Sequence, residues 1–157
     1  ILISLPEVDV FLGTGAFFQI VKAAGEPQFS HLCLLPDPVL ITVEGKDSPR
    51  DLILPHLAYL KIAEGCCKTC TYCIIPKLRG RQKSRPPEDI IAEARRLMAA
   101  GVKELVLVAQ DTTAYGKDLT PAANLSRLVD DLADIGADDQ WRIAKPWFRV
   151  HIERAQH

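Results

Sequence analysis

Four of the five cysteines in this chain of 157 residues stand within eight consecutive positions, in the segment GCCKTCTYCIIP at 65–76. Cysteines that are odd in number and clustered indicate a metal or redox site in a reducing compartment rather than a secreted disulfide framework. Cys66, Cys70 and Cys73 have the spacing CxxxCxxC, which lets a short loop after a strand bring three thiolates to one face of a metal cluster. The fold must therefore present this loop as a binding site.

Three thiolates are one ligand fewer than a structural zinc site needs, and no further ligand stands at zinc-knuckle spacing. His56 precedes the strand before the loop, and the next histidine after the loop is His151. A four-iron cluster held by three thiolates keeps one iron open for a ligand from outside the protein, which makes that iron a reactive site. Cys67, beside Cys66, is expected to be a small, partly buried thiol rather than a ligand, and Cys33 an inert buried residue.

The composition excludes several classes of protein. With 48% hydrophobic and 25% charged residues and a net charge of −1, the chain is typical of a globular domain and has no global footprint for nucleic acid. Its longest apolar runs fall far short of the roughly 18 residues that a membrane span needs, so we expect a cytoplasmic protein with no membrane partner. A local basic run, KLRGRQKSR, is expected to be a solvated loop, with contact to a substrate as the alternative. Its charges alternate along the chain at Lys77, Arg79, Arg81, Lys83 and Arg85.

The first 25 residues have the pattern of one strand followed by one helix. VDVFLGTG is a short apolar strand that ends in glycines, and AFFQIVKAA has helical spacing closed by Gly25. Phe18 stands where a dinucleotide fingerprint has its third glycine, which favours a plain strand-to-helix turn over a nucleotide loop. Residues 26–56 contain five prolines and read as a linker with one strand, PVLITVE. The chain is thus predicted to have a domain boundary between 1–25 and 57–157.

Residues 57–157 alternate strands and helices. The predicted strands are LAYLKIA before the cysteines, the continuous apolar run ELVLVAQ, and a piece at 147–152. A helix is expected to begin at Pro86 and Pro87 and to end at Gly101, and a second helix to begin at Thr120 and Pro121. Their apolar faces are Ile90, Ile91, Ala94, Leu97 and Met98 in the first helix, and Leu125, Leu128, Val129, Leu132 and Ile135 in the second. This order predicts an α/β fold with a parallel sheet, open or closed into a barrel.

At the cysteine loop the chain resembles a known family. LKIAEGCCKTCTYCIIPKLRGRQKSRPPEDI is similar to the cluster loop of radical S-adenosylmethionine enzymes, and more narrowly of methylthiotransferases, whose loop commonly reads EGCNxxCxxC followed by IP, RG and SRP. The resemblance is close from Leu60 to Leu119. Cys67 departs from the Asn or Asp usual at its position, which affects the hydrogen bonds around the site rather than cluster binding.

The segment LVAQDTTAYGKDL distinguishes two branches of that family. It resembles the branch that modifies an aspartate of a small-subunit ribosomal protein, in which QDT and YG follow the second strand. The branch that modifies adenosine in transfer RNA tends to have GQNV there. Asp111, Thr112 and Thr113 therefore favour the ribosomal-protein branch.

The resemblance also implies a fold. LPEVDVFLGTGAFFQIVKAA is similar to the end of the family's N-terminal α/β domain, which in full-length members supplies three cysteines for a second cluster; those ligands are absent from this sequence. Residues 57–157 would form a partial (β/α) radical-SAM barrel, a truncated TIM-like barrel, with the resemblance weak after 135. Since a barrel of this class needs about 200 residues or more, we expect an open sheet edge and incomplete activity in this chain.

The resemblance further implies cofactors, site residues and partners. A 4Fe-4S cluster on Cys66, Cys70 and Cys73 would bind S-adenosylmethionine and cleave it to a 5′-deoxyadenosyl radical, which abstracts hydrogen from the β-carbon of the target aspartate. Tyr72 matches an aromatic that the family places beside the adenine. Gln110 and Asp111 would contact the methionine or ribose portion, because they leave the carboxyl end of a parallel strand; Asp111 could equally be a helix cap or turn residue.

The expected partners are a small-subunit ribosomal protein as substrate, with ribosomal RNA nearby, and an electron donor such as flavodoxin or ferredoxin. A second S-adenosylmethionine would supply the methyl group, and the second cluster the sulfur. Three alternatives stay open at this point: a transfer-RNA adenosine methylthiotransferase, a non-enzymatic zinc module, and an inactive fragment.

Overall fold

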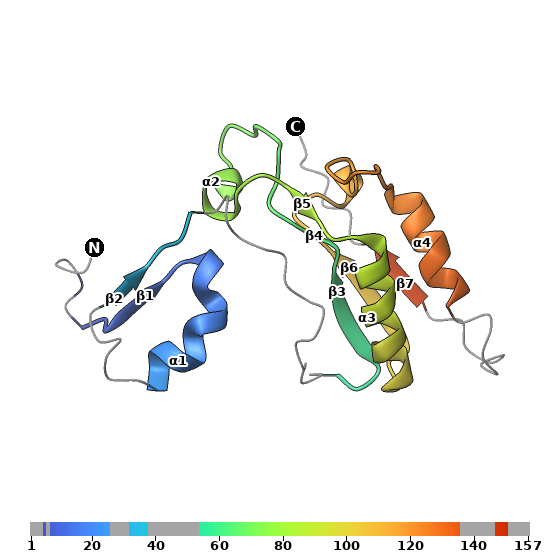
Figure 1. The fold of residues 1–157 in the computed structure, drawn as a ribbon, viewed down its shortest axis with the longest axis horizontal. Coiled ribbons are helices and arrows are strands. Elements are labelled where there is room, and N and C mark those ends of the chain that lie inside the picture. The colour runs from blue at the N-terminus through green and yellow to red at the C-terminus, as the bar shows by residue number, and fades with distance from the viewer. Residues whose placement is uncertain (1–4, 6, 26–31, 38–53, 136–146, 151–157) are drawn as a thin grey trace. The chain divides into compact units, whose positions relative to one another are not determined.

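The computed structural model describes residues 5, 7–25, 32–37, 54–135 and 147–150 (Figure 1). The chain divides into two compact units: Ile1–Thr42 with Lys68–Arg81, called unit 1 below, and Val43–Cys67 with Gln82–His157, called unit 2. The domain boundaries inferred from the sequence stay a prediction, and the predicted strand PVLITVE lies outside the described residues.

In the residues that the structure describes, unit 1 contains a two-stranded parallel sheet and three short helices. Its elements are β1 (Val10–Leu12), η1 (Thr14–Gln19), α1 (Ile20–Gly25), β2 (Leu32–Leu34) and α2 (Ile75–Arg79). The helix predicted after β1 thus begins as a 3-10 helix before it becomes α-helical. Strand β2 pairs with β1 from Val10↔Leu32 onward. The hydroxyl of Thr14 in η1 donates to the carbonyl of Leu78 in α2 at 2.7 Å, which links the cysteine loop to this unit.

Unit 2 is built on a parallel sheet with strand order β3-β6-β7. These strands are β3 (Leu57–Lys61), β6 (Glu104–Val108) and β7 (Trp147–Val150). The register runs from Leu57↔Glu104 and from Glu104↔Trp147. Strand β6 buries its three central residues in succession, as expected of a strand covered on both faces. The parallel sheet and the third strand predicted from the sequence are therefore confirmed.

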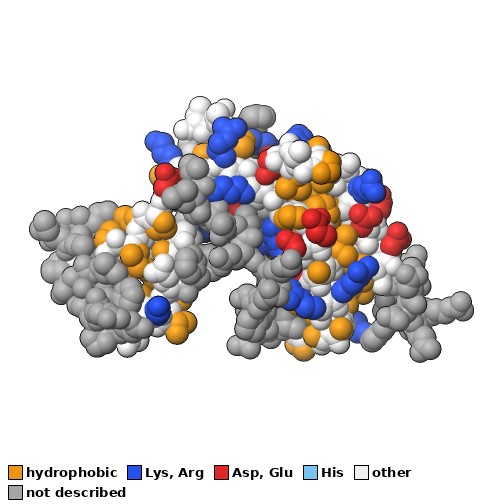
Figure 2. Space-filling model, viewed as in Figure 1, with side chains coloured by type: hydrophobic (Ala, Val, Ile, Leu, Met, Phe, Trp, Pro, Cys, Tyr) orange, Lys and Arg blue, Asp and Glu red, His pale blue; other side chains and the backbone are white. Residues whose placement is uncertain are grey.

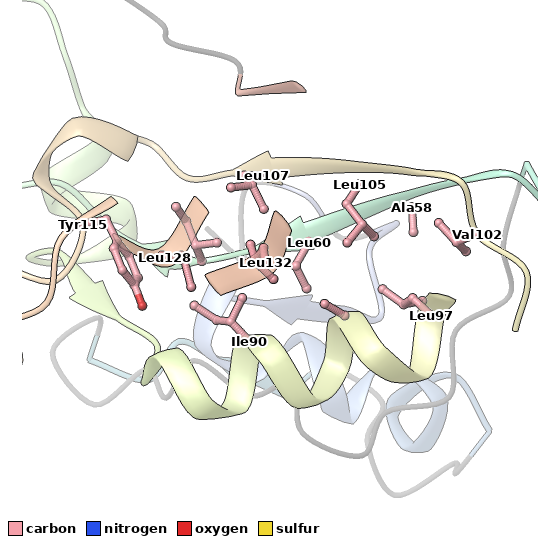
Figure 3. Close-up of a cluster of buried hydrophobic side chains, with 12 residues drawn as sticks. Ala58, Leu60, Ile90, Leu97, Val102, Leu105, Leu107, Tyr115, Leu128 and Leu132 are labelled. Atoms are coloured by element: carbon pink, nitrogen blue, oxygen red, sulfur yellow. The ribbon is translucent and has the colours of Figure 1, made fainter. Parts of the chain in front are cut away.

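Two helices of unit 2 supply apolar faces to the core: α3 (Pro87–Ala99) and α4 (Leu125–Asp134). Ile90, Ala94 and Leu97 recur at helical spacing on α3 and are buried, as the sequence predicted. Figure 3 shows Leu105 and Leu107 of β6 and Ile90 of α3 pointing into one shared cluster. The alternation of strand and helix that defines the α/β class is thus held together by one core.

The start of α4 differs from the prediction. We expected Thr120 and Pro121 to begin the helix, but its N-cap is Asn124, whose side chain accepts from the backbone N–H of Arg127 at 2.9 Å. Residues 116–123 instead form a turn, because the carbonyl of Gly116 accepts from the N–H groups of Leu119 and Ala123. The cap side chain, rather than the proline, fixes where this helix begins.

A small antiparallel pair closes the cysteine loop. Strand β4 (Ala63–Glu64) pairs with β5 (Lys83–Ser84) through Ala63↔Ser84 and Glu64↔Lys83. The N–H of Arg85 adds a hydrogen bond to the carbonyl of Ile62 at 2.9 Å. The pairing of β4 with β5 therefore holds the two ends of residues 65–82 together. No helix in the described ranges has the length and apolar character to cross a membrane.

Candidate cluster and cofactor site

The three predicted ligand cysteines stand at different places along the loop. Cys66 is buried and follows β4 in unit 2, whereas Cys70 and Cys73 are half-buried and belong to unit 1. The N–H of Cys73 donates to the carbonyl of Cys70 at 3.1 Å, so these two residues share a tight turn just before α2. The structure describes all five cysteines, and none of them forms a disulfide.

The structure does not present a finished metal site. Among the residues that it describes, no three side chains of His, Cys, Asp or Glu are gathered so that they could hold a metal ion. The assignment of Cys66, Cys70 and Cys73 as one ligand set therefore stays a prediction from their spacing. The donor chemistry fits an iron–sulfur cluster, because iron in such clusters is held by thiolates and these thiols are uncommitted to disulfides.

Two expectations about the other cysteines are wrong. Cys33 was expected to be buried, but it is exposed; among the described residues its strand belongs to a sheet of two strands, which has little surface to cover it. Cys67 was expected to be partly buried and is also exposed, since it lies beyond the end of β4 where the ladder has stopped. Both thiols are accessible.

A buried carboxylate stands two residues before Cys66. Glu64 is 2% exposed, and its Oε1 accepts from the side-chain amide of Gln110 at 2.9 Å and from the N–H of Gly65 at 3.3 Å. Its Oε2 forms an ion pair with Lys61. Glu64 was not among the site residues predicted from the sequence, although an acidic side chain between an apolar strand and a cysteine is a visible signal of a buried partner.

Gln110 and Asp111 lie just past the carboxyl end of β6, the edge at which α/β sheets bind ligands. The Oε1 atom of Gln110 is buried and has no hydrogen-bond partner among the described residues. Asp111 is buried, occupies the N-cap position of η4 (Thr112–Ala114), and accepts from the hydroxyl of Thr113 at 2.6 Å. Gln110 thus offers an unused acceptor, while one oxygen of Asp111 is committed to a local turn.

Arg85 is structural rather than solvated. We expected the whole basic run to lie in solvent, but Arg85 is 3% exposed and forms an ion pair with Glu93 of α3 at 2.7 Å. It also donates to the carbonyl of Lys61 at 2.7 Å, and its own carbonyl accepts from the hydroxyl of Tyr115 at 2.9 Å. Burial, and next the charge of Glu88, raises the pKa of Tyr115. These contacts fix the end of the loop to the core.

The remaining basic side chains lie nearer to solvent. Lys77 and Arg81 are exposed. The face of the molecule drawn in Figure 2 has Lys and Arg side chains in the region of α2. Tyr72 is 80% exposed, and Ile74 and Leu78 close to it in the loop are exposed as well. An exposed aromatic side chain beside cysteines is available for stacking on a ligand.

Gln82 is a second buried amide. Both polar atoms of its side chain are buried, and no group in the described part of the chain forms a hydrogen bond with them. It stands one position before β5, directly past the register pair Glu64↔Lys83. Unpaired buried amides are rare in proteins and commonly mark a place where a ligand or water completes the hydrogen bonds.

A pocket of about 450 Å³ lies on another part of unit 2, between the start of α3 and the loop that leads into α4. Its walls combine prolines and alanines with the side chains of Glu88, Arg127 and Asp131. None of the predicted site residues lines it. The pocket therefore does not bear on the predicted site residues, which belong to the cysteine loop and to the segment just past β6.

Comparison with known proteins identifies the class of this fold and site. The sequence model described as "Radical SAM superfamily" matches residues 60–154. The matched range begins within β3 and includes the cysteine loop, β6 and β7. The chain belongs to the radical SAM superfamily. Membership implies an iron–sulfur cluster and S-adenosylmethionine as cofactors, and it confirms the partial (β/α) architecture expected from the sequence.

Within the superfamily the chain is similar to proteins named ribosomal protein uS12 methylthiotransferase RimO. The protein from Desulfosudis oleivorans is 53% identical over 136 residues, which are 86% of this chain and 31% of that protein. The protein from Anaeromyxobacter sp. (strain K) is 49% identical over 148 residues, which are 94% of this chain and 29% of that protein. The chain thus spans about three tenths of the length of these relatives, and the resemblance to methylthiotransferases is confirmed.

Among solved structures, the chain matches the radical S-adenosylmethionine methyltransferase TsrM from Kitasatospora setae, with cobalamin and a [4Fe-4S] cluster bound. The match covers 60% of this chain and 17% of that chain, at 18% sequence identity and a TM-score of 0.45.

Proposed function

We propose that this chain is the cluster-binding part of a radical S-adenosylmethionine methylthiotransferase that adds a methylthio group to the β-carbon of an aspartate in ribosomal protein uS12. One observation carries the proposal: the 53% identity to a protein of that name extends over 136 residues, which are 86% of the chain. The segment QDTTAYG at 110–116 supports the ribosomal-protein branch over the transfer-RNA branch. The enzyme is a transferase.

The cluster would be held by Cys66, Cys70 and Cys73. When bound, it supplies the electron that breaks a carbon–sulfur bond of S-adenosylmethionine. Cys66 follows directly on the β4–β5 pair, which fixes its backbone to unit 2. The turn from Cys70 to Cys73 sets the spacing of the other two thiols. The exposed Cys67 and Cys33 take no part in our assignment.

S-adenosylmethionine would be bound by residues at the end of β6 and in the loop. The buried Oε1 of Gln110 is an acceptor for an N–H or O–H group of the methionine or ribose portion. Asp111 stands beside it with one oxygen committed to Thr113. The exposed ring of Tyr72 would stack on the adenine, which also removes that ring from water.

The substrate and partners follow from the relatives. Ribosomal protein uS12 is the proposed substrate, and the exposed Lys77 and Arg81 would lie toward ribosomal RNA, whose phosphates attract cations. A flavodoxin or ferredoxin would supply the electron. A second cluster would supply the sulfur. An enzyme with these partners would work in the cytoplasm.

Anaerobic reconstitution with iron and sulfide tests the site. We expect about four irons per chain, and an electron paramagnetic resonance spectrum of the reduced protein that changes when S-adenosylmethionine is added. Replacing Cys66, Cys70 or Cys73 by Ala should remove most of the iron. Cys67→Ala and Cys33→Ala are matched controls and should retain it; loss of iron in a control, or its retention in a ligand variant, contradicts the assignment.

The substrate is tested with the full-length protein that contains this chain. It is incubated with a reductant, S-adenosylmethionine and either uS12 or transfer RNA, and each product is examined by mass spectrometry. A mass increase on an aspartate of uS12 is the expected result. Modification of transfer RNA instead would favour the other branch, and zinc without sulfide in the purified protein would favour a structural metal module.

A further inference from the structure

The carboxylate of Glu64 joins the start of the cysteine loop to the end of β6. It is almost fully buried, and one of its oxygens accepts from both the amide of Gln110 and the N–H of Gly65, the residue before Cys66. Gln110 is 46 residues away in the sequence. One side chain therefore touches both segments in which our proposed function places the cofactors.

The chemistry of this contact decides how Gln110 is oriented. A side-chain amide has one end that donates and one that accepts, and the two ends have nearly the same shape. An ionised carboxylate can only accept, so the NH₂ end of Gln110 must face Glu64, at 2.9 Å. The carbonyl end of Gln110 then points away from Glu64, and its Oε1 is the buried atom without a partner.

Lys61 occupies the other oxygen of Glu64. Its ammonium forms an ion pair with that second oxygen, so the first is the one that accepts from Gln110. The backbone carbonyl of Lys61 accepts in turn from the guanidinium of Arg85 at 2.7 Å. Arg85 thus contacts the main chain of Lys61 and not the ammonium group that pairs with Glu64.

We propose that Glu64 is a positioning residue: it fixes the amide of Gln110 so that the carbonyl oxygen is presented to a hydrogen-bond donor of S-adenosylmethionine. This inference rests on the proposed function, because it takes Gln110 to contact that cofactor. An unsatisfied buried carbonyl costs free energy in the unliganded protein, and a ligand N–H or O–H group recovers it on binding. Glu64 thereby contributes to affinity without touching the ligand.

The test is Glu64→Gln, which keeps the shape and size of the side chain. The new amide can donate as well as accept, so Gln110 is free to turn its carbonyl toward position 64 and its NH₂ group toward the ligand. We expect the reconstituted variant to retain its iron and to bind S-adenosylmethionine roughly tenfold more weakly, measured by equilibrium dialysis with labelled cofactor. The cofactor-induced change in the electron paramagnetic resonance spectrum should need correspondingly more ligand.

Glu93→Gln is the matched control, because it makes the same change in another buried, ion-paired carboxylate of unit 2. It should lower stability yet leave the affinity for S-adenosylmethionine unchanged. The double variant Glu64→Gln with Gln110→Glu provides a rescue: a carboxylate at position 110 accepts from the amide introduced at position 64 with one oxygen and offers the other to the ligand, so the affinity should recover.

Three results would overturn the inference while leaving the proposed function intact. These are wild-type affinity in Glu64→Gln, an equal loss of affinity in Glu93→Gln, and loss of iron in Glu64→Gln, which would mean that Glu64 supports the cysteine loop instead. A wild-type protein that binds its cluster but not S-adenosylmethionine would contradict the proposed function itself. The two failures are therefore distinguishable.

Discussion

Gly116 should tolerate a methyl group far less well than Gly101, although both have a backbone that favours glycine. Gly116 has φ +79° and Gly101 has φ +97°, and an alanine in this left-handed region costs about 1–2 kcal/mol. Only Gly116 is also crowded: an added Cβ would lie 2.3 Å from the carbonyl oxygen and 2.5 Å from the carbonyl carbon of Ala123. At Gly101 no atom of the described residues stands within 4 Å of the added Cβ.

The crowding at Gly116 cannot be relieved by a side-chain rotation, because the nearest atoms are backbone. Ala123 is held in place by its own N–H, which donates to the carbonyl of Gly116 at 3.0 Å. Overpacking of this kind costs about 1–3 kcal/mol. We therefore expect Gly116→Ala to lose about 2–5 kcal/mol of unfolding free energy, and Gly101→Ala about 1–2 kcal/mol.

The assay is urea unfolding followed by far-ultraviolet circular dichroism on the two variants and the wild type. The unfolding free energy of a small protein falls by about 1–3 kcal/mol for each molar of urea. The urea concentration at the unfolding midpoint should therefore be clearly lower for Gly116→Ala than for Gly101→Ala. Equal midpoints would refute the reasoning, because the conformational cost is shared and only the contact with Ala123 differs. The N–H of Gly116 also donates to the hydroxyl of Ser84, so Gly116→Ala should weaken cluster retention as well.

Three further variants test individual contacts. Tyr115→Phe removes a buried hydroxyl whose pKa is raised by burial. Above about pH 10 this tyrosine ionises in the unfolded chain but not in the folded one, so the unfolding free energy of the wild type should fall relative to that of the variant, by up to about 1.4 kcal/mol per pH unit. Urea titrations of both proteins at pH 8 to 11 measure this difference. The same dependence of unfolding free energy on pH in the two proteins would contradict this expectation. Gln82→Leu replaces a buried amide without partners, so the cluster-free protein should unfold at a higher urea concentration, and a lower midpoint would mean that the amide is satisfied. Asn124→Ala removes the cap of α4 and should cost about 1 kcal/mol, whereas Asn124→Asp should cost little; equal losses in both would argue against capping.

The periodic elements of unit 2 could be predicted from the sequence because their signal is local. The spacing of Ile90, Ala94 and Leu97 predicted the buried face of α3, and the run ELVLV predicted β6 as a strand covered on both sides. The strand at Trp147 was predicted in the same way and pairs with β6. In each case the hydrophobic pattern within about ten residues contains the information.

The contacts around the site could not be predicted, because they join residues that are distant in the sequence. Nothing near Glu64 indicates that it meets Gln110, and nothing near Arg85 indicates that it turns inward to Glu93 rather than out to solvent with Lys77. Strand β2 was missed because three residues in a proline-rich stretch have no period of their own and depend on β1 for their hydrogen bonds. Helix α2 was not predicted, because it has five residues, none of them buried, and so has no apolar face with helical spacing.

The antiparallel pair of β4 and β5 has an evolutionary consequence. Because Ala63↔Ser84 and Glu64↔Lys83 tie the two ends of residues 65–82 together, the sheet does not depend on the length of chain between them. Doubling the length of such a closed loop costs only about 0.6 kcal/mol. Insertions, deletions and substitutions between the two ends can therefore accumulate with little effect on the core, and one barrel scaffold can be inherited with many different cluster loops.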